Sequence, residues 1–130
     1  MSNLNTVEIK AFVPARDFEL SKRFYEAMGF RIAFSDADLA YLHAGDCSFL
    51  LQNFYVKEQA DNFMMHLLVE DADAWYRQLV DADLAGRFPG TRMTPPQDQP
   101  WGMRDFAVVD PSGVLWRIAH NLPRTQEAGA

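Results

Sequence analysis

Few side chains in this sequence have the types and spacing that metal or nucleophilic chemistry requires. The three histidines, His43, His66 and His120, lie far apart, and none forms a pair with a spacing typical of metal ligands, such as HxxxH. A glycine-rich phosphate loop and the GxSxG nucleophile motif are also absent from the sequence. We therefore expect each histidine to be a surface or hydrogen-bonded residue, and we assign no catalytic residue.

The single cysteine and the paired carboxylates are better explained by structure than by catalysis. Cys47 lies between Asp46 and Ser48 with no adjacent cation to activate its thiol, so we expect a small buried residue. Asp71 and Asp73 come where a helix is predicted to begin, and carboxylates are favoured at that end of a helix. We interpret them as capping residues.

The first half of the chain predicts one strand, one helix and a strand meander. Residues 7–13 alternate between the two faces that a half-buried strand would have. Asp17 can cap the helix that follows, and Gly29 can end it. Three short apolar runs then predict the meander, at residues 30–34, 39–43 and 48–52.

The second half repeats this plan after a linker at residues 54–62. An alternating segment at 63–69 precedes a helix that begins after Asp71 and ends near Gly86. The remaining segments are a turn-rich stretch, two strands and a loose tail, at residues 89–100, 103–109, 114–119 and 122–130.

Length and composition fit one domain covering residues 1–130, with modules at about 7–53 and 63–121. The 130 residues are 48% hydrophobic, enough to form a core without disulfides. The net charge of −6 argues against a nucleic-acid surface, and no apolar run approaches the roughly 20 residues that span a bilayer. The chain has one cysteine and no basic segment followed by an apolar run at its N-terminus. We therefore expect a cytoplasmic protein that binds neither nucleic acid nor membranes.

The alternation gives the predicted sheet two different faces. One face is apolar, and we expect helices to cover it. The other mixes apolar, polar and charged side chains, which suits either a small-molecule groove or an ordinary solvated surface. The predicted fold is therefore α+β, with two tandem βαβββ modules forming a cupped mixed sheet and helices on its outer face. Residues of the apolar face include Val7, Ile9, Ala11, Val13, Phe49, Leu51, Met65, Leu67, Trp116 and Ile118.

Several short motifs, in this order and spacing, resemble the glyoxalase/bleomycin-resistance/dioxygenase superfamily, also called vicinal oxygen chelate proteins. They are VPARD at residues 13–17, SKRFYEAMGF at 21–30, VED at 69–71, QPWGMRDF at 99–106 and DPSGVLW at 110–116. The fourth of these, placed before the DPSG turn, is similar to the bleomycin-binding members. The resemblance covers nearly the whole chain and implies the fold described above.

Metal-dependent members of this superfamily hold a divalent ion with two histidines and two glutamates on their inner strands. Carried over to this sequence, those positions hold Lys10, Leu50, Met64 and Arg117. Two of these residues are cations that would repel a metal ion, and His66 is the only nearby substitute. The resemblance therefore implies a cavity with no metal and no other cofactor.

The bleomycin-binding members are dimers with ligand grooves at the interface. The resemblance therefore implies a homodimer that binds a small molecule, such as an aromatic drug or natural product. For stacking on a planar ligand the candidates are Trp101 and Phe12; for hydrogen bonding they are Arg104, His66 and Gln52; and Lys10, Leu50, Met64 and Arg117 would line the same face. Trp101 could instead close the edge of the core. Arg104 could instead pair with Asp105 or with a carboxylate on another strand.

We favour a non-enzymatic binding protein that works without a metal and sequesters a drug. A second hypothesis is a lyase, isomerase or dioxygenase with a non-standard metal site, and a third is a dimeric scaffold with a vestigial groove. Net acidity favours a cationic ligand, whereas Lys10 and Arg117 on the mixed face would favour an anionic or carbonyl-bearing one. Titration with divalent metals separates the first hypothesis from the second.

Overall fold

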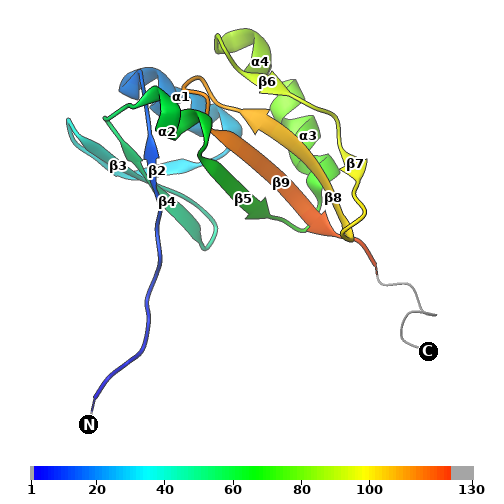
Figure 1. Cartoon of the computed structure of the whole chain (residues 1–130), viewed down its shortest axis with the longest axis horizontal. Helices are drawn as coiled ribbons and strands as arrows, with labels where there is room; N and C mark the ends of the chain where they lie inside the picture. Colours follow the sequence, from blue (N-terminus) through cyan, green and yellow to red (C-terminus); the bar gives the residue numbers. More distant parts are fainter. Residues whose placement is uncertain (1, 124–130) are drawn as a thin grey trace.

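The computed structural model describes residues 2–123 and has two βαβββ-type modules (Figure 1). The first module comprises β1 (Phe12–Pro14), α1 (Phe18–Met28), β2 (Arg31–Ser35), β3 (Leu39–Ala44) and β4 (Cys47–Gln52). A short helix, α2 (Lys57–Asp61), leads to the second. That module comprises β5 (Met64–Leu68), α3 (Ala72–Asp81), α4 (Leu84–Arg87), β6 (Arg92–Met93), β7 (Gln97–Asp98), β8 (Met103–Val109) and β9 (Leu115–Asn121).

The two modules form separate sheets with matching topology. The first sheet has the order β1-β4-β3-β2, and the second has the order β5-β9-β8-β6, with β7 also paired to β8. In each sheet the first strand of the module runs parallel to the last, β1 beside β4 and β5 beside β9, while the other pairs are antiparallel. This shared pattern confirms the predicted α+β fold and the internal repeat.

Helix α1 forms where its local signals predict it. The Asp17 side chain accepts a hydrogen bond from the Leu20 backbone N–H at 3.1 Å, which satisfies a donor at the helix start. Gly29 ends the helix with φ +123°, a conformation that side chains disfavour. A β-carbon at Gly29 would also lie 2.7 Å from the Gln78 amide nitrogen of α3. Gly29 is therefore required for the turn, and a β-carbon there would displace the Gln78 amide, which donates to the Met28 carbonyl at 3.0 Å.

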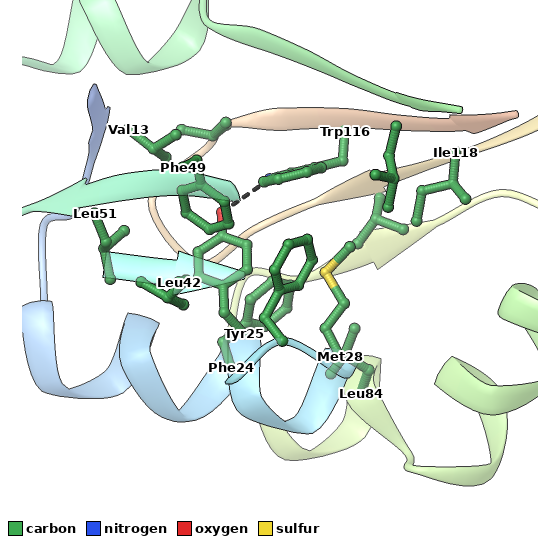
Figure 2. Close-up of a cluster of buried hydrophobic side chains, with 14 of the residues drawn as sticks. Val13, Phe24, Tyr25, Met28, Leu42, Phe49, Leu51, Leu84, Trp116 and Ile118 are labelled. Atoms are coloured by element: carbon green, nitrogen blue, oxygen red, sulfur yellow. Dashed lines mark hydrogen bonds between the residues drawn. The ribbon is translucent and has the colours of Figure 1, made fainter. Parts of the chain in front are cut away.

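One continuous core joins the modules, centred on Tyr25 of α1 (Figure 2). The Tyr25 ring packs against the rings of Phe49 and Trp116, with centroids 5.0 and 5.6 Å away. The Trp116 indole N–H donates to the Tyr25 hydroxyl at 2.9 Å, and that hydroxyl donates to the buried carboxylate of Asp110 at 2.5 Å. Burial and the nearby Asp110 charge raise the pKa of Tyr25 well above its usual value.

Asp110 also organises the DPSG turn that the sequence predicts. Its second oxygen accepts the backbone N–H groups of Ser112 and Val114, at 2.8 and 2.9 Å. Burial raises the pKa of the Asp110 carboxyl, and these hydrogen bonds partly oppose that rise. The turn thereby connects the second module to α1 of the first through a side chain that water does not reach.

The predicted strand at residues 7–13 is wrong over most of its length. Strand β1 begins at Phe12, and the residues before it run away from the body of the protein (Figure 1). Val7 and Ile9, expected in the apolar face under a helix, are 98% and 94% exposed. The alternation is present in the sequence, but no side chain among residues 2–123 covers Val7 or Ile9.

Three further expectations about element boundaries need correction. The linker contains helix α2, which the sequence reading left out. Gly86 does not end the second helix. It lies inside α4, because α3 ends at Asp81 and Asp83 adopts φ +50° before α4 begins. The turn-rich stretch holds β6 and β7, which supply the missing strand of the second βαβββ module in two short pieces.

The end of the chain is only partly described. Strand β9 continues to Asn121, two residues beyond the predicted end of the strand, and residues 124–130 of the predicted loose tail lie outside the described residues. No helix within residues 2–123 combines the length and apolar character needed to cross a membrane.

Candidate ligand-binding site

In the first module, the predicted site residues lie on the face that points away from the core. Phe12 of β1 pairs with Leu50 of β4, and Pro14 pairs with Gln52, so Phe12, Leu50 and Gln52 come from two adjacent parallel strands. Phe12 is half exposed, while Leu50 and Gln52 are partly buried. This group offers an apolar surface with one amide.

Lys10 lies next to this group, and its charge is paired. Its ammonium forms an ion pair with Glu8 at 2.8 Å, and Glu8 also accepts hydrogen bonds from the hydroxyls of Tyr41 and Ser48. The hydrogen bond from Lys10 is the main reason that the pKa of Glu8 falls to about 2. The hydrogen bond with Glu8 raises the pKa of Lys10 in turn. Both groups therefore stay ionised at physiological pH, and their opposite charges cancel.

A groove of about 450 Å³ adjoins this ion pair at the end of the first sheet. None of the predicted site residues lines it, although Glu8, Tyr41, His43 and Ser48 do. Cys47 also lines this groove and is exposed, which corrects the expectation of a buried filler. Tyr41 and His43 alternate with the buried Ala40 and Leu42, so strand parity could have added them to the predicted face.

In the second module, Met64, His66 and Arg117 share one face. The parallel register places His66 beside Arg117 and Met64 beside Leu115. Met64 and His66 are exposed, and Arg117 is half-buried. Among residues 2–123, no hydrogen bond or ion pair connects this group with Lys10, Phe12, Leu50 or Gln52 of the first module. The predicted site is therefore brought together as two separate groups.

Trp101 lies beside Arg117 of the second group, in the loop between β7 and β8. Its side chain is 60% exposed, so it is presented from the surface and does not close the core edge. The Arg117 guanidinium carbon is 6.0 Å from the centroid of the indole ring. Arg117 in turn donates to the Asp105 carboxylate at 2.7 Å, and that carboxylate also accepts a hydrogen bond from the Gln99 amide at 2.9 Å.

Arg104 points away from this group. Its guanidinium bonds to Asp73 of α3 at 3.1 Å and to Asp98 of β7 at 3.0 Å. Along β8, Arg104 alternates in step with the buried Phe106 and Val108, so it lies on the helix side of the sheet. The structure thus realises the alternative in which Arg104 pairs with carboxylates elsewhere, and Asp105 pairs with Arg117 instead.

Asp105 and Gln99 are the residues of this site that sequence reasoning missed. Asp105 was considered only as a neighbour of Arg104, although it alternates in step with Ala107 and faces the same side as Arg117. An acidic residue within an apolar strand, on the face that carries a cation, was the available signal.

Two further residues that the sequence analysis considered, His120 and Asp71, have structural partners. The His120 imidazole accepts the Ala72 N–H at 2.8 Å and so caps the start of α3, as does the Asp71 carboxylate, which accepts the Ala74 N–H at 3.0 Å. Within residues 2–123, no three side chains of His, Cys, Asp or Glu lie close enough together to hold a metal ion.

Paired βαβββ modules with helices outside and a mixed inner face define a class of proteins that includes both metal enzymes and binding proteins. Comparison with known families places the chain within that class. Residues 4–118 match the family model described as the Glyoxalase/Bleomycin resistance protein/Dioxygenase superfamily. The chain belongs to this superfamily.

Within this superfamily, the chain is similar to bleomycin-resistance and bleomycin-binding proteins. The chain is 34% identical over 114 residues to a bleomycin resistance protein of Klebsiella pneumoniae, covering 84% of this chain and 88% of that protein. A crystal structure of a bleomycin-binding protein complexed with bleomycin is 32% identical, with a TM-score of 0.77, and covers 89% of this chain and 99% of that one. The copper(II)-bleomycin complex of the Streptomyces verticillus bleomycin-binding protein is 27% identical, with a TM-score of 0.73, and covers 94% and 100% of the two chains.

Proposed function

We propose that this protein binds and sequesters a planar aromatic antibiotic of the bleomycin class, without chemical change to the drug. The observation that carries the proposal is Trp101, a 60% exposed indole held beside Arg117 on the mixed face of the second module. An indole offers a broad apolar surface and an N–H donor, both suited to a flat conjugated ligand. The similarity to bleomycin-binding proteins supports the same assignment.

The charge pattern of the mixed face supports a neutral or cationic ligand. Lys10 is paired with Glu8 and Arg117 with Asp105, so neither cation adds a net positive charge to the site. The chain as a whole carries a net charge of −6, which attracts cations at long range. Both observations favour a neutral or cationic ligand over an anionic one.

We infer further that the working form is a cytoplasmic homodimer. The two groups of candidate residues lie on different sheets, and a second copy can place the Phe12 group of one chain opposite the Trp101 group of the other. Leu4, Val7 and Ile9 on the N-terminal segment are at least 88% exposed, and burying them against a second copy would gain the area that their alternation otherwise leaves in water. Lining a drug-sized groove from both copies gives it the depth that one open sheet lacks.

Binding is tested by calorimetric titration of the purified chain with bleomycin. We expect saturable binding with a dissociation constant of about 1 µM or tighter, together with a rise in melting temperature. Kanamycin, a polycation without an aromatic ring, is the control and should not bind. Absence of heat and of a melting shift with bleomycin, or equal binding of both drugs, would overturn the proposal.

The dimer is tested by analytical ultracentrifugation at micromolar concentration. We expect a species of twice the 14.8 kDa chain mass. A variant with Val7 and Ile9 changed to serine should shift toward monomer, while Leu4→Ser alone should shift it less. A wild-type protein that sediments only as a 14.8 kDa species contradicts the dimer.

A further inference from the structure

Asp105 is a buried carboxylate that contacts Arg117, the cation beside the exposed Trp101 ring. Its side chain is 3% exposed, although it belongs to the mixed face that is otherwise open. Both of its oxygens are bonded, one to the Arg117 guanidinium at 2.7 Å and the other to the Gln99 amide at 2.9 Å. Burying a carboxylate is costly unless it is paired and hydrogen-bonded, and this one is both.

We propose that Asp105 is a positioning residue of the ligand site, which holds Arg117 and the Gln99 loop together and cancels the positive charge beside Trp101. Its role in ligand binding rests on the proposed function, whereas the charge beside Trp101 can be measured without any ligand.

The sheet register fixes the contact between Asp105 and Arg117. Asp105 pairs with Ala119 across β8 and β9, and Arg117 pairs with Ala107, so the two charged residues are diagonal neighbours on one face. A long arginine side chain reaches a diagonal carboxylate, and the charge-assisted hydrogen bond is stronger than a neutral one. Because Asp105 is buried, water does not compete for this bond.

The second oxygen of Asp105 ties down the loop that carries the indole. Gln99 opens this loop, its backbone N–H bonds to the Met103 carbonyl at 2.7 Å, and its own carbonyl accepts the Gly102 N–H at 3.1 Å. Gly102 adopts φ +86°, which glycine adopts without strain. Trp101 therefore lies in a closed turn whose first residue bonds to Asp105 and whose ring lies beside the cation that Asp105 holds.

The pairing also sets which ligands the indole accepts. The face of an aromatic ring attracts cations, but a cation already 6.0 Å from the ring repels a second one. With Asp105 in place the guanidinium charge is balanced, and a positively charged planar ligand can stack. Without Asp105 the same position would carry an uncompensated charge and would repel that ligand.

The charge beside Trp101 is tested by fluorescence quenching with iodide and caesium ions, taking the difference between each protein and its Trp101→Phe counterpart. Asp105→Asn should raise the ratio of iodide to caesium quenching by about twofold or more, because Arg117 is then unbalanced. Asp98→Asn is the matched control, since it removes one negative charge from the other side of β8. An Asp105→Asn ratio equal to that of the control would overturn the proposal.

The effect on binding is tested by a double-mutant cycle with bleomycin. Asp105→Asn should weaken bleomycin binding by about tenfold in the wild-type background and by less than about twofold in a Trp101→Ala background, because it acts through the indole. Equal losses in both backgrounds would mean general damage and would overturn the positioning role. Failure of wild type to bind bleomycin would refute the proposed function, while the quenching experiment would still decide the charge pairing.

Two companion variants keep the test independent of folding losses. Asp105→Asn combined with Arg117→Gln replaces the ion pair by two neutral amides and should return the iodide-to-caesium ratio to the wild-type value. Gln99→Ala keeps the ion pair but frees the loop, so it should leave that ratio unchanged while raising quenching of Trp101 by neutral acrylamide. The opposite pattern in either variant contradicts the proposal.

Discussion

Two clusters in this protein combine a tryptophan with a buried aspartate, and they serve different ends. In the core, Trp116 is 2% exposed and reaches Asp110 through the Tyr25 hydroxyl. On the mixed face, Trp101 is 60% exposed and reaches Asp105 through Arg117. The surface of Trp116 is already buried inside the chain, so its burial stabilises the fold. The surface of Trp101 is exposed, so burying it against a ligand would stabilise the complex.

The two buried aspartates differ in the residue that joins each of them to its tryptophan, Tyr25 for Asp110 and Arg117 for Asp105. Tyr25 and the backbone N–H groups of Ser112 and Val114 satisfy Asp110 with neutral donors, which suits a site without water. Arg117 satisfies Asp105 with a charge, which suits a half-open face where part of the guanidinium meets solvent. Asp110 therefore stabilises the contact between the two modules, whereas Asp105 holds a half-buried cation on a face that is open to solvent.

The largest effect should come from removing the joint in the core. Tyr25→Phe leaves the Trp116 indole N–H and one Asp110 oxygen without their partner in a buried site, and we expect the free energy of unfolding to fall by about 3 kcal/mol. Urea denaturation measures it. Tyr76→Phe is the matched control, because its ring packs edge-on against Phe106 at 5.3 Å, and it should change stability by less than about 0.5 kcal/mol. Equal losses in the two variants would show that the Tyr25 network is not special.

A smaller effect should appear as a pH dependence of stability. The pKa of Asp110 is raised by burial above its usual 3.8, so the native state holds its proton to higher pH than the unfolded chain does. The contribution of this group is therefore fully present below pH 3.8 and is lost as pH rises through the folded-state pKa. Relative to Asp110→Asn, the wild-type free energy of unfolding should fall as pH rises across that window. A rise over the same window would contradict the burial argument.

What the sequence could predict depends on how far its signals reach. Asp17, Gly29 and Asp71 act on backbone groups within a few residues, so the helix boundaries they mark are largely correct. The repeat predicted two modules of the same plan, but the parallel pairing of β1 with β4 and of β5 with β9 came only from the structure. The predicted burial of Val7 and Ile9 was wrong. Alternation shows that one face of a segment could be covered, but it does not show what covers it.

The candidate site was predictable only in part, for the same reason. The sequence left two alternatives for Trp101, a stacking surface or a plug at the edge of the core, and the structure places the indole at the surface, 60% exposed. The partners of Arg104 and Arg117 depend on the register between β8 and β9 and on the position of α3, and no local pattern contains them. Parity along β8 would have placed Arg104 and Asp105 on opposite faces of the sheet, because Arg104 alternates with core residues and Asp105 does not.

The most direct test of the comparison is Trp101→Ala, with melting temperature and bleomycin affinity measured on the same preparation. Because the indole is exposed and contributes little to the core, stability should change by no more than about 0.5 kcal/mol. Affinity should fall by about ten- to a hundredfold, since stacking and burial of the indole against the ligand are both lost. A loss of about 3 kcal/mol in stability with bleomycin affinity preserved would contradict the account and place Trp101 with Trp116 in the core.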